Sequence, residues 1–205
     1  MKTSAAGVSL HLDLQSLHFS VTARGETWSW ARDYVPRLVS AEGEEIPFTQ
    51  ADNITHSLWD TGVGRGIRSQ YEDFTVNGRP VDLSFETIVW IQEATGEVYF
   101  EFIPISEEGI SLKAVYWPGP MAFDTPRADW YSALNVLQGL IVPNTWENQV
   151  GPLHFEGQMC SCSAYMPWFG QVKPGAGYIA ICQQPWDAAS CSSSSAGHSA
   201  VWPSL

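Results

Sequence analysis

The chain has 205 residues, of which 44% are hydrophobic and 16% are charged, so a substantial core is expected and a disordered chain is excluded. The 22 Asp and Glu residues against 10 Lys and Arg give a formal net charge of -12. This charge repels a phosphate backbone or an anionic lipid surface, and no run approaches the roughly 18 apolar residues that cross a bilayer. We expect a soluble protein with no nucleic-acid or membrane partner.

The first strands are predicted at the N-terminus. Residues 8–14 and 17–22 alternate apolar with polar side chains, which is typical of strands with one buried face. A turn at Gly25 leads into the next strand, where Trp28 and Trp30 are expected in the core. Because the alternation leaves no continuous hydrophobic stretch, no signal peptide is predicted, and the compartment stays open.

The clearest hairpin joins residues 83–93 to residues 97–105 through the short connection 94–96. Both flanks are rich in β-branched and aromatic residues, and Gly96 fits a hairpin loop. Trp90, within the first flank, is also expected in the core. A smaller turn is predicted at Asn77-Gly78.

Further strands are predicted at 110–117, 139–142, 159–164 and 177–182, and a helical turn at 129–137. We predict an all-β fold, a large two-sheet antiparallel supersandwich of about ten to twelve strands. It forms one domain over residues 1–187. The Ser-rich residues 188–205 are expected to be a poorly ordered tail or a truncated continuation.

Metal, cofactor and nucleotide sites are not predicted. Cys160, Cys162, Cys182 and Cys191 lack paired ligand spacing, so they are interpreted as buried or incidental thiols. The glycine-rich residues 62–66 lack the Lys-Ser/Thr ending of a phosphate loop and are interpreted as a tight turn.

Carboxyl side chains are the residues that a glycosidase would need in pairs, but no two of them form a recognisable acid and nucleophile signature. Each is interpreted first as a solvated surface group. The candidates are Asp60, Glu72, Asp73, Asp124, Asp129, Glu147 and Asp187.

Aromatic residues beside Pro and Gly are the candidates for sugar contact, because loops expose them and flat rings pack against pyranose C–H faces. Covering an open end of the sandwich is the alternative role. The predicted carbohydrate-binding residues are Trp117, Trp130, Tyr131, Trp168, Phe169, Trp186 and Asp187.

Several segments together resemble a known family. They are residues 59–67 (WDTGVGRGI) with 71–74, 139–143 (GLIVP), 165–170 (YMPWFG) with 177–181, and 185–187 (PWD). They look like the N-terminal β-supersandwich, galactose-mutarotase-like, of glycoside hydrolases similar to family 129 and the endo-α-N-acetylgalactosaminidases. The resemblance implies that a (β/α)₈ barrel, absent from this chain, carries the catalytic carboxylates.

The function predicted from these observations is that of a non-catalytic domain or fragment of a glycoside hydrolase. It would support the missing catalytic barrel, contact glycan at its rim, and not be active alone. Two alternatives stay open, a free-standing carbohydrate-binding module and a self-contained sugar epimerase or lyase on a similar sandwich.

Overall fold

The computed structural model describes residues 1–122, 127–136, 139–146, 164–181, 183, 190–192 and 200–204. These residues form eighteen strands and one short 3-10 helix, η1 (Phe48–Gln50), so the predicted all-β class is confirmed. The strands outnumber the ten to twelve predicted because several of them, such as β12 (Met121–Ala122), are too short to show a period-two pattern. In the part of the chain that the structure describes, no helix reaches the length and apolar character needed to span a membrane.

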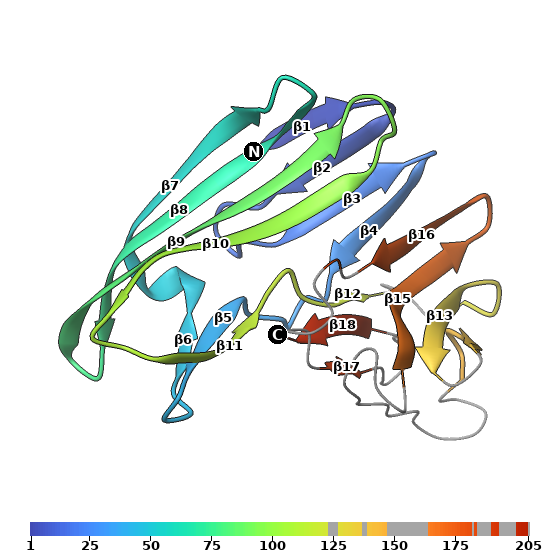
Figure 1. The fold of residues 1–205 in the computed structure, drawn as a ribbon. Coiled ribbons are helices and arrows are strands. Elements are labelled where there is room, and N and C mark those ends of the chain that lie inside the picture. Colours follow the sequence, from blue (N-terminus) through green and yellow to red (C-terminus); the bar gives the residue numbers. More distant parts are fainter. Residues whose placement is uncertain are drawn as a thin grey trace. The chain divides into compact units, whose positions relative to one another are not determined.

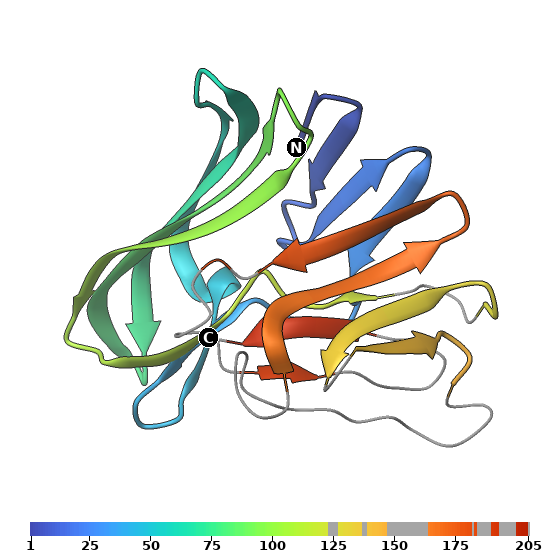
Figure 2. The same cartoon turned by 45° about the vertical axis from the view of Figure 1, so that its right-hand side comes forward.

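The chain divides into two compact units. The first contains residues 1–27 and 35–118, and the second contains residues 28–34 and 119–205 (Figures 1 and 2). The strand β4 (Glu26–Trp30) therefore begins in the first unit and ends in the second.

The first unit begins with an antiparallel meander of β1 (Lys2–Ala5), β2 (Val8–Leu12), β3 (Phe19–Ala23) and the start of β4. The turn between β1 and β2 has positive φ at Ala6 (49°) and Gly7 (76°), as a tight hairpin requires. Leu10 and Leu12 of β2 are buried, which confirms the strand face predicted from the alternation.

The largest sheet of the first unit has the order β10-β9-β8-β7 (Figure 1). It comprises β7 (Ala51–Asp60), β8 (Gly64–Val76), β9 (Arg79–Gln92) and β10 (Val98–Glu108). The predicted hairpin is confirmed, because β9 and β10 pair antiparallel from Val98 opposite Ile91 to Glu108 opposite Asp82. The predicted Asn77-Gly78 turn is confirmed as well and joins β8 to β9.

A three-stranded sheet of order β11-β5-β6 completes the first unit. Its strands are β5 (Arg37–Ser40), β6 (Glu45–Pro47) and β11 (Leu112–Tyr116). The core lies on one face of β8 and β9, where the ring of Phe48 packs 4.6 Å from that of Phe85 and 5.2 Å from that of Tyr71. Phe19 of β3 meets Phe100 of β10 edge-on at 6.5 Å, so the meander packs against the largest sheet.

The second unit contains two groups of paired strands. One continues from β4 in the order β4-β12-β18-β17, with β17 (Ser190–Ser192) and β18 (Ala200–Ser204). The other has the order β14-β13-β15-β16 and comprises β13 (Tyr131–Val136), β14 (Leu140–Pro143), β15 (Ala164–Lys173) and β16 (Ala176–Ile181).

The helical turn predicted at 129–137 is wrong, because this segment contains the strand β13. Tyr131–Val136 pairs with β14 on one side and β15 on the other, and Ser132 and Leu134 are buried alternately with more exposed neighbours. Residues 159–163 of another predicted strand lie outside the described residues. The poorly ordered tail stays a prediction, since only β17 and β18 are described there.

Candidate functional site

The candidate site is the face of the sheet β10-β9-β8-β7 that points away from the core of the first unit. Strand register brings side chains from all four strands into rows across this face, because residues directly opposite each other share a face. We call it the polar-aromatic face. Its principal residues are Thr55, Trp59, Arg68, Gln70, Glu86, Trp90, Tyr99 and Glu101.

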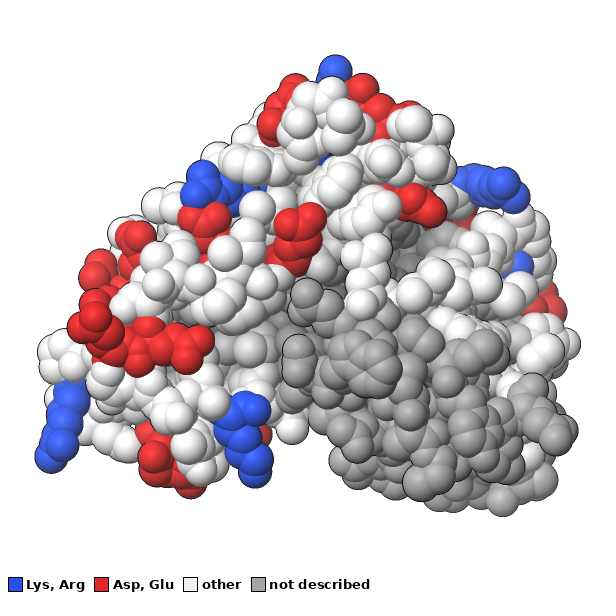
Figure 3. All heavy atoms as spheres, viewed as in Figure 1, with Lys and Arg blue, Asp and Glu red and all other residues white. Residues whose placement is uncertain are grey.

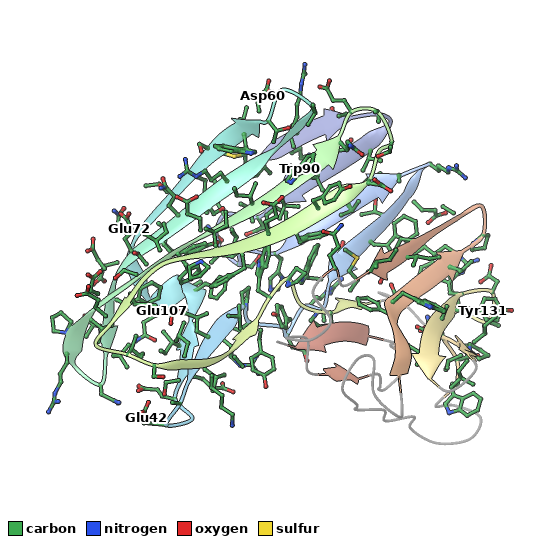
Figure 4. All side chains as sticks on the ribbon, in the orientation of Figure 1. Glu42, Asp60, Glu72, Trp90, Glu107 and Tyr131 are labelled. Carbon is green, nitrogen blue, oxygen red and sulfur yellow. The ribbon has the colours of Figure 1, made fainter. Side chains whose placement is uncertain are left out.

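The first row centres on Trp90, labelled in Figure 4. Trp90 stands opposite Gly66, and a Cβ atom built on Gly66 would lie 2.4 Å from the Cβ atom of Trp90. The indole stacks on the Tyr99 ring at 4.5 Å with planes 12° apart, and its Nε1 donates to Oε1 of Glu101 at 2.6 Å. A strand residue without a side chain thus leaves room for an oriented aromatic pair.

The neighbouring rows carry a hydrogen-bonded cluster around Glu86. Arg68 donates to both oxygens of this carboxylate, with 2.7 Å from Nε to Oε2, and Nε2 of Gln70 donates to Oε1 at 3.0 Å. The Arg68 guanidinium also lies 5.2 Å from the centre of the Trp59 ring, a cation–π distance. Glu86 is only 8% exposed, so its carboxylate is largely shielded from solvent.

The electrostatics of this cluster fix its charge state. The hydrogen bonds from Arg68 lower the pKa of Glu86 and outweigh the opposing effect of burial, and the hydrogen bond from Gln70 lowers this pKa further. The same pairing raises the pKa of Arg68. Glu86 is therefore ionised at neutral pH with its oxygens occupied, which suits positioning and excludes it as a general acid.

Two other carboxylates of this face, those of Glu72 and Glu101, also have partners. Oε2 of Glu72 accepts a hydrogen bond from Nδ2 of Asn53 at 3.0 Å, and Glu101 accepts from Trp90. Glu72, Asp73 and Asp82 line an open hollow at one end of the sheet, and Figure 3 shows acidic residues gathered there. Among the described residues no cluster of His, Cys, Asp or Glu is arranged to hold a metal.

Two of the predicted sugar-contacting residues are not exposed as expected. Trp117 is 4% exposed and meets Phe100 edge-on at 6.0 Å, inside the first unit. Phe169 of β15 is 6% exposed, on the inner face of its sheet. Proximity to Pro or Gly in the sequence was a poor indicator of exposure here, because both rings fill the core.

Three others lie in the second unit. Trp130 is half-buried, with the Lys173 ammonium 4.5 Å from its ring centre, whereas Tyr131 on β13 is 36% exposed (Figure 4). Trp168 of β15 is half-buried opposite Ile181 of β16. Trp186 and Asp187 lie outside the described residues, and sugar contact by any of the seven stays a prediction.

The remaining sequence candidates have local roles where they are described. Oδ1 of Asp60 accepts from the Gly62 N–H at 2.8 Å, and Gly62 has a φ of 76°, which confirms the tight-turn interpretation. Asp129 pairs with Arg127 at 3.0 Å. Asp124, Glu147, Cys160, Cys162 and Cys182 lie outside the described residues, and Cys191 is described only as part of β17.

The sequence interpretation missed the polar-aromatic face. Trp28 and Trp30 are buried as predicted, but Trp90 was wrongly assigned to the core. Its segment has apolar residues at both odd and even positions, and therefore on both faces of the strand. Alternation of apolar and polar residues could not show which face was buried. The two glycines at positions 64 and 66 were the signal that could have revealed it, because a glycine within a strand often marks a close approach by a neighbouring group, here Trp90.

Comparison with known proteins gave similarity to solved structures only. No protein-family model matches the sequence, and no curated protein matches it. The α-N-acetylgalactosaminidase NagBb from Bifidobacterium bifidum in complex with GalNAc aligns over 100% of this chain at 31% identity and a TM-score of 0.86. Its complex with Gal-NHAc-DNJ gives 30% and 0.86, and its ligand-free form 31% and 0.83. The chain spans 32–33% of the length of these glycosidase chains and is similar in sequence and fold to that part of them.

Proposed function

We propose that this chain is a non-catalytic domain of a glycoside hydrolase and supports a catalytic domain carried by the remainder of a longer polypeptide. The observation that carries the proposal is the alignment of the entire chain with one third of an α-N-acetylgalactosaminidase at 31% identity. The catalytic domain would be the barrel expected from the family-129-like resemblance.

The fold proposed for this role is a supersandwich of stacked antiparallel sheets. The packing of the β1–β4 meander against the sheet β10-β9-β8-β7, through Phe19 and Phe100, supports it. Such a scaffold offers rigid strands and broad faces against which a second domain can pack.

The state of the carboxylates supports a non-catalytic role. Hydrolysis of a glycoside generally requires two carboxyl groups on either side of one bond, one of them protonated at the start. On the polar-aromatic face, Glu86, Glu72 and Glu101 are each engaged by Arg68, Asn53 or Trp90. Their arrangement favours binding and structural order over proton transfer.

A second candidate function, glycan binding without catalysis, is favoured by the same face. The Trp90 and Tyr99 pair lies beside amide, carboxylate and guanidinium groups, which is the combination that packs against a sugar ring and hydrogen-bonds its hydroxyls. Tryptophan fluorescence of the isolated chain titrated with GalNAc tests this. We expect a saturable change that Trp90→Ala removes and Trp117→Phe, at a buried position, preserves.

The main proposal is tested by complementation. The isolated chain is assayed with an α-linked N-acetylgalactosaminide, and so is a chimera in which it replaces the aligned third of NagBb. We expect no hydrolysis by the isolated chain and hydrolysis by the chimera. Turnover by the isolated chain, or a folded chimera without activity, would contradict the support role.

A further inference from the structure

The sheet β14-β13-β15-β16 has an unusual distribution of polarity between its two faces. Its inner face carries Ser132, Gln171 and Lys173, all less than 10% exposed. The Lys173 ammonium lies between the rings of Trp28 (5.2 Å) and Trp130 (4.5 Å), and Nε2 of Gln171 donates to the Met121 carbonyl at 2.9 Å. Gln171 and Lys173 thus make their polar contacts inside the second unit.

The outer face is apolar and exposed. Ile141, Ile179 and Ile181 are 67–69% exposed, and Val172 and Tyr131 are 46% and 36% exposed. Register places Ile141, Ala133, Gly170 and Ile179 in one row and Pro143, Tyr131, Val172 and Gly177 in the next. Trp168, opposite Ile181, completes what we call the apolar sheet face.

No charged residue occurs among these described positions, in a chain of net charge -12. An antiparallel sheet with one face in water normally places its polar residues on that face and its apolar residues inside. Here the exposed face is apolar, and the inner face combines the polar residues Ser132, Gln171 and Lys173 with the apolar core residues Leu134, Val142 and Phe169. A contiguous apolar surface of this kind marks a site where another protein surface packs.

We propose that the apolar sheet face packs against the remainder of the glycoside hydrolase polypeptide, and this rests on the function proposed above. The similar glycosidase chains are about three times as long as the aligned region, so two thirds of such a polypeptide is available to cover it. A second copy of this chain is the less favourable occupant, because two molecules of charge -12 repel each other.

The experiment uses Ile141→Lys and Ile179→Lys, which lie in the same row on separate strands. Leu58→Lys on β7 is the matched control, because Leu58 is 66% exposed but lies in the first unit. In the isolated chain we expect both isoleucine variants to keep the melting temperature within about 2 °C of the parent, since they alter solvated positions. They should also reduce binding of a hydrophobic dye by about half, while the control leaves it unchanged.

In the NagBb chimera, the same isoleucine variants should lower the melting temperature by roughly 5 °C or more, because a lysine would be buried at the interface. Leu58→Lys should have no such effect. If the chimera is active and its melting temperature is unchanged by Ile141→Lys and Ile179→Lys, this inference is overturned and the proposed function still stands. A folded but inactive parent chimera would contradict both. A dimer of the isolated chain that the isoleucine variants dissociate, with an unaffected chimera, would assign the face to self-association.

Discussion

At the scale of single residues, glycine decides where Trp90 can lie. Gly66 is opposite Trp90 in the paired strand, and an added methyl group would lie 2.4 Å from both the Cβ atom of Trp90 and the Val89 carbonyl oxygen. The second of these atoms belongs to the backbone and cannot rotate away. The aromatic pair with Tyr99 therefore depends on a residue that contributes no side chain.

Gly66→Ala is accordingly expected to destabilise the first unit by about 2–4 kcal/mol, through overpacking against the backbone. Urea unfolding followed by tryptophan fluorescence measures the loss. Gly177→Ala in β16 is the control, because its nearest atom would be 3.3 Å away, and we expect a cost below about 1 kcal/mol. Equal effects of the two substitutions would contradict the packing argument.

The Arg68 and Glu86 pair makes stability depend on pH. The pKa of Glu86 is lower in the folded chain than its ordinary value of 4.5, chiefly because of the hydrogen bonds from Arg68. The stabilisation is thus present above about pH 4.5 and is lost as the pH falls through the folded-state pKa. Acid weakens the cluster on the polar-aromatic face.

Glu86→Gln should lower the free energy of unfolding by about 1–2 kcal/mol at pH 7 and reduce its fall between pH 5 and 3. Denaturant unfolding at a series of pH values measures both effects. Glu45→Gln is the control, since Glu45 pairs with Arg37 but its side chain is 63% exposed, and such pairs contribute about 0–1 kcal/mol. An unchanged pH profile in Glu86→Gln would refute the assignment.

At the scale of elements, turn chemistry was the most reliable signal in the sequence. Asn77 and Gly78 both have positive φ, 52° and 72°, which is the geometry of a two-residue hairpin turn and the reason this dipeptide marks one. The turn sets the register of β8 on β9 as far as Phe74 opposite Val81, and an irregularity between Phe74 and Tyr71 then shifts the pairing so that Gly66 lies opposite Trp90.

Gly78→Val should therefore cost about 1–2 kcal/mol, since a β-branched residue is strained at positive φ. Thermal unfolding gives the loss. Thr75→Val, at an exposed strand position just before the turn, is the control and should be nearly neutral. A neutral Gly78→Val would mean that the register is fixed by strand packing alone.

The sequence predicts where strands occur, but it predicts less well which face of each strand is buried and how exposed its residues are. Residues 83–93 have apolar side chains at both parities, so nothing local shows that Leu83, Phe85 and Val89 point inward while Trp90 points outward. Similarly, the sequence predicts a helical turn at residues 129–137, where the strand Tyr131–Val136 is found, because one short segment has too few residues to distinguish the two periods. Pairing with the next strand, β14, and with the more distant strand β15 decides its conformation.

The apolar exposed face of the sheet β14-β13-β15-β16 could not have been predicted either. In β16 the apolar residues at positions 179 and 181 indicate one buried face, and the ordinary expectation is that it faces the core. Only the placement of Gln171 and Lys173 against Trp28, Trp130 and Met121 shows that polar groups share the inner face with apolar residues such as Phe169.

At the scale of the whole molecule, the two units are interleaved along the chain. The second unit takes residues 28–34 from the N-terminal region and the rest from beyond residue 118. Trp28 packs edge-on against Tyr178 at 5.6 Å, and Trp30 stands opposite Met121 in the pairing of β4 with β12. No single cut separates the units.

A fragment of residues 119–205 should consequently fail to fold, because it lacks Trp28 and the strand that pairs with β12. Near-ultraviolet circular dichroism and proteolysis, compared with the full chain, measure this. Addition of a peptide covering residues 26–34 is the control and should increase protection of the fragment. A stable, protected fragment without the peptide would contradict the interleaving.

The division of β4 between the two units also has a consequence for biosynthesis. Trp28 and Trp30 are synthesised long before their contact residues, Tyr178 for Trp28 and Met121 for Trp30. Until the segment that contains Met121 and Tyr178 has been synthesised, two large indoles and an unpaired strand edge remain open to non-native contacts. We therefore expect this segment to mature late in synthesis and to benefit from chaperone shielding until its partners emerge.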